Sequence, residues 1–540
     1  MRSPLKSLLP PAAMAGILFL STPQGLPAGE RKITLTDAVY RTLETNPGVK
    51  IEEERVQQSE GELQSASGQF DWTGVGTFSK EVRRDHLTDE QEKQAELASL
   101  FTQRHFSDNR REQTTIYSLG AKKQSRSGVV VYPKLSTLDS EDLTVPIESE
   151  NRSDVSAELI IPLMRGLGEA NTGALEMAAQ SRLTATEFFS KHNISGRILQ
   201  TASAYWSSLA ALHTLKIMED AISRAEEIYR LVELLVKGGE VEPALMHQAQ
   251  AKLAQRKADI KQSELNYYES RQRLALAMGL SPGELADPPS PEGPFPPVTD
   301  VRLLDKALEA RYIQQALERR GDYQAARTGI NTQEILLQKA SDDRRMRLDL
   351  DLGFGMSGLN ERGDWSRYYR SLYHDKAGPN VFAGLSLEWP IENNTAVGEY
   401  LRRKSLVREQ KLTVTQLSQG IASDVLVSLE RLRSSFQEYR LSRDSVEAYK
   451  EAVKHENYKV RMGESSLTSL IDIEDQYLEA RLSHINALRR YAAALAELRY
   501  ATGTLLTEES RSFRFRTYSL MTLPVLQEPI PEKGPEKSHE

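Results

Sequence analysis

Three acidic residues lie in short segments where polar and apolar side chains alternate. Asp349 and Asp351 alternate with leucines, and Glu388 lies between Leu387 and Trp389. A period of two places the carboxylates on one face of a β-strand and the apolar side chains on the other. Such a polar face suits a water-filled lumen, with the apolar face and Trp389 towards lipid. A soluble hairpin with its apolar face on a protein core gives the same alternation, so the pattern leaves both open.

The residue types that usually perform catalysis are not arranged for it. The chain has no cysteine, which excludes disulfides, thiolate metal sites and a cysteine nucleophile. Its nine histidines lack metal-ligand spacing, and neither a phosphate-binding loop nor a serine-nucleophile motif occurs. We therefore expect no enzymatic activity, no cofactor and no metal. The net charge is -7, so the chain lacks the excess of basic residues that is typical of nucleic-acid-binding proteins.

The N-terminus has the order of an export signal. Arg2 and Lys6 precede a mostly apolar stretch from Leu8 to Leu20, followed by small residues and proline up to Gly29. We expect a signal peptide over residues 1–28. An anchor helix is less favoured, because two prolines interrupt a run already too short to span. No other apolar run reaches spanning length, so residence in a membrane would require a closed barrel.

The rest of the chain divides into two similar halves, residues 29–280 and 301–506, joined by a proline-rich linker over 281–300. Gly238 precedes Gly463 by 225 positions, and the leucines that follow each glycine keep this spacing. Ala66 and Pro162 are 96 positions apart, whereas their counterparts Ala340 and Pro390 are 50 apart. The first half therefore carries an insertion of 46 residues, within about 80–154.

Each half is expected to run helix, strands, long helix, glycine turn and returning helix. The predicted helices are Thr36–Ser67 with Thr36 as N-cap, Thr172–Val236, Pro243–Met278, Leu303–Ser341 and Leu467–Ala501. Strands are predicted over 346–356 and 381–391, with two more over 115–123 and 129–137 in the insertion. The added strands either widen the sheet or form a hairpin outside it. The tail over 507–540 is expected to be partly disordered.

Three motifs in this order resemble the TolC-like outer-membrane efflux family, over residues 33–506. They are Leu35-Thr36-Asp37-Ala38-Val39 followed by Asn46-Pro47, the run from Pro162 to Gly168, and the run from Gly463 to Asp472. The resemblance implies an α+β membrane protein with an internal duplication. In that fold a homotrimer forms one outer-membrane β-barrel, typically from four strands per chain, which continues as a long α-helical coiled-coil periplasmic tunnel. Asp349, Asp351 and Glu388 would then face the lumen of the barrel.

The resemblance also nominates functional positions. Asp472 matches the second of two family aspartates at the periplasmic constriction, and Ser469 occupies the position of the first, which changes the charge expected there. Glu474 and Asp475 are expected to be solvated on the helix face. The helical tips, Gly238, Gly239, Glu240 and Met462, Gly463, Glu464, would contact a periplasmic adaptor. Glycine at a tip is equally expected from helix capping alone.

The function implied is the outer-membrane channel of a tripartite efflux or type I secretion system. Such a channel is a passive conduit from periplasm or cytoplasm to the exterior, located in the cell outer membrane with a periplasmic extension. Its partners would be an adaptor (membrane fusion) protein, an inner-membrane transporter and outer-membrane lipid, with no nucleic acid. The alternative is a non-conducting periplasmic coiled-coil scaffold whose hairpins pack on protein.

Overall fold

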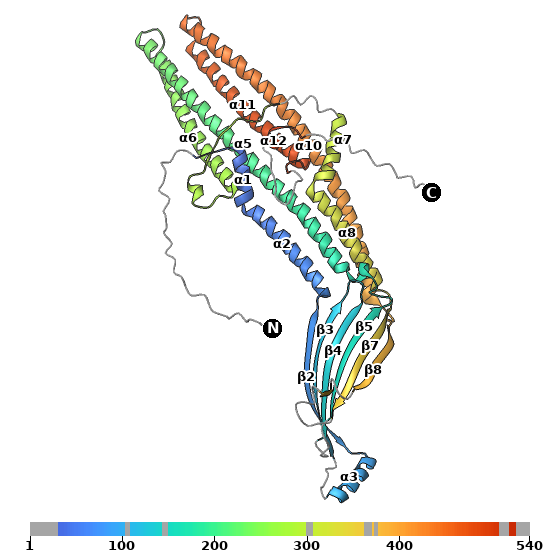
Figure 1. Ribbon diagram of the computed structural model, residues 1–540. Coiled ribbons are helices and arrows are strands. Elements are labelled where there is room, and N and C mark those ends of the chain that lie inside the picture. Colours follow the sequence, from blue (N-terminus) through green and yellow to red (C-terminus); the bar gives the residue numbers. More distant parts are fainter. Residues whose placement is uncertain are drawn as a thin grey trace, which may run out of the picture.

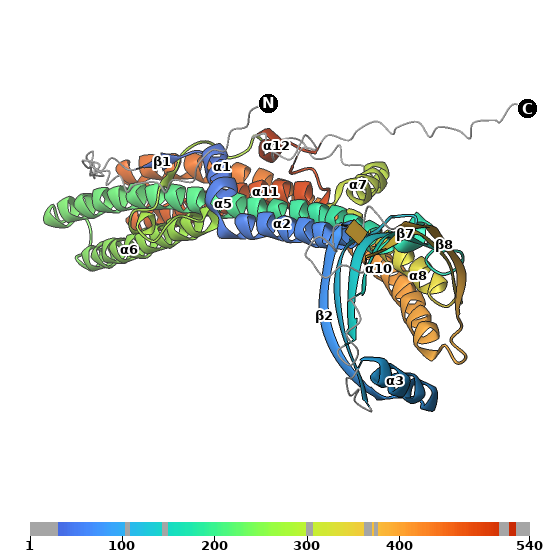
Figure 2. The ribbon, with the colours of Figure 1, turned by 60° about the horizontal axis from the view of Figure 1, so that its bottom comes forward.

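The protein is an elongated molecule with long helices at one end and a curved sheet at the other (Figures 1 and 2). Its structure is a computed structural model that describes residues 31–102, 109–142, 150–298, 306–360, 370–371, 376–506 and 518–524. The signal peptide predicted over 1–28 lies outside the described residues. Of the helices that the structure describes, none combines the length and apolar character needed to cross a membrane.

Two very long helices set the length of the molecule. They are α5 (Ala174–Lys237), with 64 residues, and α10 (Asn394–Arg461), with 68. At 1.5 Å per residue each is about 100 Å long. The returning helices α6 (Ala244–Met278) and α11 (Leu467–Ala501) pack beside them at one end. At the sheet end, α2 (Pro47–Ser67) packs beside α5, and α8 (Gly321–Asp342) packs against both α5 and α10.

The first helix predicted in each half is in fact broken once. In the first half α1 (Leu35–Thr45) ends before Asn46-Pro47, and in the second half α7 (Lys306–Arg319) ends before α8. Proline is tolerated only in the first turn of a helix, so α2 must start at Pro47. The expected N-cap was also wrong: Thr34, not Thr36, caps α1, and its Oγ1 accepts from the Asp37 N–H at 3.2 Å.

Both breaks are held by a glycine at the end of a returning helix. Gly279 has a φ of 76°, and a Cβ there would lie 2.5 Å from Asn46 Cα. Gly503 has a φ of 67°, and a Cβ there would lie 2.8 Å from the Arg319 carbonyl carbon. Only glycine combines positive φ with such close approach. Each half therefore clamps its broken helix in the same way, as expected of a duplication.

The sheet has six antiparallel strands in the order β2-β3-β4-β5-β7-β8, with β2 and β8 at its open edges. The strands are β2 (Thr73–His86), β3 (Asn109–Gln124), β4 (Val130–Asp142), β5 (Glu150–Pro162), β7 (Arg347–Asn360) and β8 (Lys376–Glu388). The two strands predicted in the insertion are β3 and β4, and they lie within the sheet. A short helix, α3 (Asp89–Thr102), follows β2 at the end of the sheet that is far from the helices (Figure 1).

The proline-rich linker is an ordered strap on the helical core rather than a free connection. Its β6 (Ser290–Pro291) pairs in parallel with β1 (Lys32–Ile33). Phe295 stacks on the buried Trp206 with ring centroids 5.7 Å apart, and the Tyr205 hydroxyl donates to the Glu292 carbonyl at 2.6 Å. Within the tail, α12 (Tyr518–Met521) also packs on this core, and Arg499 donates to the Thr522 carbonyl at 2.7 Å.

Candidate functional site

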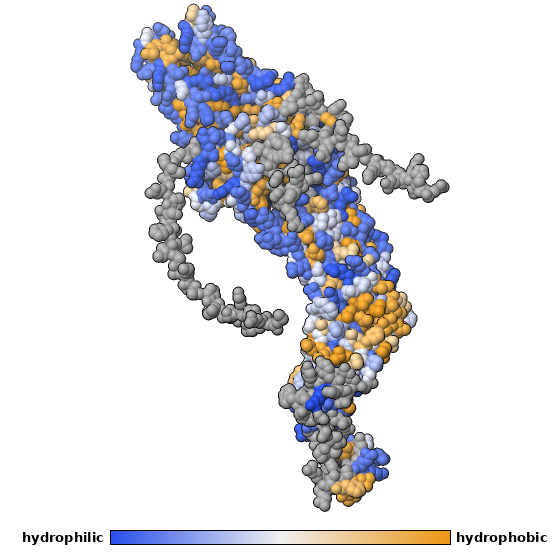
Figure 3. Space-filling view, in the orientation of Figure 1, coloured by the Kyte–Doolittle hydropathy of each residue, from blue (hydrophilic) through white to orange (hydrophobic). Residues whose placement is uncertain are grey.

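One face of the sheet is apolar and exposed. Its register sets Leu350 opposite Leu385 and Phe354 opposite Val381, so the apolar side chains of neighbouring strands form a continuous band. Val381 and Leu385 remain 71% and 68% exposed. The band appears as an orange patch over the sheet in Figure 3. Its exposed members on the strands are Phe78, Val82, Tyr117, Leu119, Leu135, Val155, Phe354, Met356, Val381, Leu385 and Leu387. A soluble hairpin would bury this face on a core of its own chain, and the described part of the chain leaves it uncovered.

The opposite face carries the three carboxylates predicted to share a side. Asp349 lies opposite Ser386, Asp351 opposite Gly384, and Glu388 opposite Arg347. The Asp349 carboxylate accepts from Arg347 Nε at 2.6 Å, and Glu388 lies 3.3 Å from Arg165. Glu158 on β5 and Lys134 on β4 belong to the same face, and so does the exposed Phe382 on β8. The sheet therefore has an exposed apolar band on one face and these charged groups on the other.

The two helical tips have the same backbone geometry. At the first, Gly239 donates to the Val236 carbonyl at 3.1 Å and Glu240 to the Leu235 carbonyl at 2.9 Å. At the second, Gly463 donates to Val460 at 3.1 Å and Glu464 to Lys459 at 2.9 Å. Gly239 and Gly463 have φ values of 75° and 73°, the left-handed residue of a Schellman cap. The structural counterpart of Gly463 is thus Gly239, not Gly238 as the sequence alignment had it.

All six predicted tip residues lie in these turns. Gly238 and Met462 are in the right-handed region directly before the left-handed glycine. Glu240, Met462 and Glu464 are exposed. The tips therefore present a methionine and two carboxylates on backbone turns that are fixed by their caps.

Asp472 and Ser469 lie close to the second tip, in the first two turns of α11. The Ser466 hydroxyl caps this helix by accepting from the Ser469 N–H at 3.1 Å. Asp472 is exposed, on a different side of the helix from the buried Leu470 and Ile471. In the single chain these two positions do not form a site together, so the expected constriction requires further copies.

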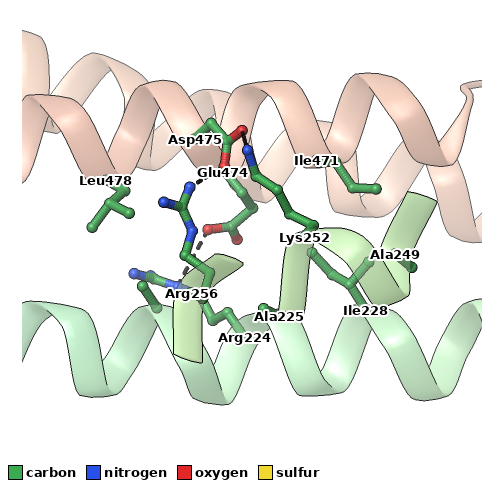
Figure 4. A pocket seen from close by; sticks show the side chains of 11 residues that line it. Arg224, Ala225, Ile228, Ala249, Lys252, Arg256, Ile471, Glu474, Asp475 and Leu478 are labelled. Atoms are coloured by element: carbon green, nitrogen blue, oxygen red, sulfur yellow. Dashed lines mark hydrogen bonds and ion pairs between the residues drawn. The ribbon is translucent and has the colours of Figure 1, made fainter. Parts of the chain in front are cut away.

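The neighbouring carboxylates Glu474 and Asp475 were expected to be solvated, but Glu474 is largely buried and Asp475 is only a third exposed. Glu474 is only 14% exposed and lies 3.2 Å from Arg224 Nε on α5. Its burial raises the pKa of the carboxyl, against the lowering effect of Arg224. Asp475 forms ion pairs with Lys252 and Arg256, both on α6 (Figure 4). We call Arg224, Lys252, Arg256, Glu474 and Asp475 the tip cluster.

The tip cluster joins the first helical hairpin to the second. Its charged groups surround a small cavity otherwise lined by apolar side chains, namely Ala221, Ala225, Ile228, Ala249, Ile471 and Leu478 (Figure 4). Arg481 on α11 adds a further ion pair to Asp220 on α5, at 2.8 Å. Sequence reasoning missed the basic members because their partners depend on how three helices are rotated against each other. The spacing of Lys252 and Arg256, one turn apart, was the available signal.

Within the described ranges, no three His, Asp or Glu side chains gather in a way that would hold a metal ion.

Comparisons with known proteins identify the fold. No protein-family model matches the sequence, and no curated protein matches it. Among solved structures, the outer-membrane channel OprN matches with a TM-score of 0.62 and 15% identity, over 87% of this chain and 90% of that chain. The Campylobacter jejuni CmeC outer membrane channel has a TM-score of 0.59 and 15% identity, over 87% and 85%.

The Neisseria gonorrhoeae MtrE outer membrane channel, solved in its open state, has a TM-score of 0.59 and 14% identity, over 87% of this chain and 88% of that chain. All three likenesses extend over the helices and the sheet together. The chain therefore has the fold of these outer-membrane channels, in agreement with the resemblance of its motifs to the TolC-like family.

Proposed function

We propose that this protein is the outer-membrane channel of a tripartite efflux or type I secretion system and acts as a passive conduit. The observation that carries the proposal is the two-sided sheet, with an exposed apolar band on one face and carboxylates on the other. The band would contact outer-membrane lipid, and the polar face, including Asp349, Asp351 and Glu388, would line the lumen. The helices would extend into the periplasm.

The open edges of the sheet support the proposal that the channel is a homotrimer. Unpaired edges in lipid are costly because their N–H and C=O groups find no water there. Pairing β2 of one copy with β8 of the next would satisfy both edges and close the barrel. Three copies of six strands each give a strand number at which barrels enclose a water-filled channel.

The helical tips are the proposed docking surface for a periplasmic adaptor, which would connect the channel to an inner-membrane transporter. Three copies of Asp472 would form a ring of carboxylates beside the tips. Such a ring attracts cations because like charges that converge on a pore reinforce each other. Ser469 in place of a second acid leaves one carboxylate ring at this level instead of two.

Single-channel conductance in a planar bilayer tests the proposal. The mature protein should insert and give stable steps with a preference for cations, and Asp472→Ala should weaken that preference. Asp444→Ala on α10 is the matched control, since this carboxylate is exposed and forms an ion pair with its neighbour Arg443. Folded protein that fractionates as a soluble periplasmic species and never inserts would refute the proposal and favour a scaffold.

A further inference from the structure

The face of the sheet that carries the carboxylates also carries one large, exposed apolar side chain. Phe382 lies at the middle of β8, opposite Gly353 on β7, and is 62% exposed. Among the strand residues that the structure describes, the other large apolar side chains of the exposed class belong to the apolar band on the opposite face. Phe382 therefore points towards the proposed lumen and away from lipid.

Glycines make room for the Phe382 ring. A Cβ at Gly384, the next residue of β8 on the same face, would lie 2.8 Å from Phe382 Cζ. A Cβ at Gly353 would lie 3.3 Å from Phe382 Cβ. The ring therefore leans along its own strand into the space above Gly384, where it compensates for the missing side chain. The rest of its surface is open to the lumen.

Two carboxylates flank this ring. Asp351 lies directly opposite Gly384, the residue that the ring covers, so the Cα atoms of these two residues are about 5 Å apart. Glu158 lies opposite Gly353 on the other side of β7, two strands from Phe382, which corresponds to about 10 Å. A ligand about 10 Å long could therefore contact the ring and both carboxylates together.

The charges of Asp351 and Glu158 are available to a ligand. Asp349 and Glu388, on the same face, each lie within 3.3 Å of an arginine. In contrast, no hydrogen bond or ion pair involves the side chain of Asp351 or Glu158 in the part of the chain that the structure describes. Lys134 on β4 shares this face, but its partner position on β5 sets it diagonal to Glu158. The surface beside the Phe382 ring is therefore negative.

A second aromatic ring lies on the other side of Glu158. Tyr132, on the inserted strand β4, is directly opposite Glu158, and a Cβ at Gly120 would lie 2.8 Å from Tyr132 Cε2. This ring thus also fills the space above a glycine. One row across four strands therefore reads Phe382, Gly353, Glu158 and Tyr132. Because Gly353 has no side chain, the row has an open floor between the phenyl ring and the carboxylate.

From this row we propose that the lumen at the sheet end binds planar organic cations. The flat part of the ligand packs on the Phe382 ring over the floor at Gly353, and its positive charge lies beside Asp351 and Glu158. Aromatic rings attract both other rings and cations, and the carboxylates attract the same ligands by charge. Anions and uncharged polar molecules lack one or both of these attractions. The inference rests on the proposed function, which makes this face a lumen, and it adds a binding site far from Asp472.

Block of the single-channel current provides the first test. Ethidium, a planar aromatic cation, is added on the outer side and compared with tetrabutylammonium, a cation without an aromatic ring. Phe382→Leu should shorten the mean block by ethidium about 2- to 10-fold and leave the block by tetrabutylammonium unchanged. Glu158→Gln should shorten both. Phe354→Leu is the matched control, because it makes the same change on the neighbouring strand and the opposite face. Unchanged block by ethidium in Phe382→Leu would overturn the inference.

Binding to the purified protein in detergent provides a test that does not require conduction. In a fluorescence anisotropy titration with ethidium, the Kd should rise about 2- to 10-fold in Phe382→Leu and stay the same in Phe354→Leu. Equal affinity of the native protein and Phe382→Leu would overturn the inference, even if the channel conducts. The expected difference in binding, together with an absence of conductance, would instead count against the proposed function alone.

Discussion

The tip cluster makes a quantitative prediction about how firmly the two hairpins are held together. In Asp475→Asn the carboxylate that pairs with both Lys252 and Arg256 is lost, while the size of the side chain is kept. Arg256 is only 13% exposed, so water replaces its lost partner incompletely. A hydrogen bond to a charged group contributes about 1.5–3 kcal/mol. Since Asp475 itself is a third exposed, we expect a loss near the lower part of this range, about 2 kcal/mol.

Amide hydrogen exchange measures this loss locally. When opening is in rapid equilibrium, about 2 kcal/mol corresponds to roughly 30-fold faster exchange in α6 around Lys252 and in α11 around Asp475. Helix α2, at the sheet end, should not change. Asp472→Asn is the matched control, because it removes the same charge from the same helix at an exposed position. If both variants exchanged alike, net charge and not the ion pairs would explain the effect, and the reasoning would be refuted.

Further predictions concern the caps, the junction and the clamps. Gly239→Ala should destabilise the first tip by about 1 kcal/mol because of its positive φ, while Gly238→Ala, at a φ of −75°, should be nearly neutral; exchange of the tip amides compares them. The Arg126 guanidinium makes a bidentate ion pair with Glu176 near the start of α5. Arg126→Ala should therefore lower the temperature at which the oligomer dissociates in a gel, and Arg126→Lys should recover part of the loss. The hydrogen bond from Arg126 lowers the pKa of Glu176. The stability from this pair should therefore be present above the ordinary carboxyl pKa and be lost as the pH falls through the lowered value. In Arg126→Ala the dissociation temperature should depend less on pH on the acid side. Gly279→Ala should prevent folding or reduce the yield of folded protein severely, because its Cβ would overlap Asn46, whereas Gly283→Ala, with open space around its Cβ, should express normally.

Most helices could be predicted from local sequence patterns, whereas features that depend on packing between distant segments could not. The returning helix Leu467–Ala501 was predicted with both ends correct, because Ser466 caps it and strong helix formers fill it. The break at Asn46-Pro47 was missed although Pro47 was its signal. The doublet Gly238-Gly239 hid which glycine takes the positive φ, since both residues are compatible with either position.

The sheet and the tip cluster show the same limit. Alternation predicted the inserted strands, but whether they join the sheet depends on pairing with β2 and β5, which are distant in sequence. Likewise, Glu474 and Asp475 look like surface residues on a single helix. Only the approach of α5 and α6 turns them into buried or bridging partners.

The glycine clamps and the proline-rich strap lie at the same level of the molecule, near the ends of α6 and α11. On the sheet side of this level α2 and α8 pack beside the long helices, and on the tip side the two hairpins, joined to each other by the tip cluster, extend for the 35 residues of each returning helix. The arrangement is that of a lever with a fixed fulcrum and a long arm of about 50 Å. A rotation of only about 5° at the fulcrum would move the tips by about 4 Å over an arm of this length. Adjustments too small to disturb the packing of the clamps are therefore large displacements where the chain would meet its partner.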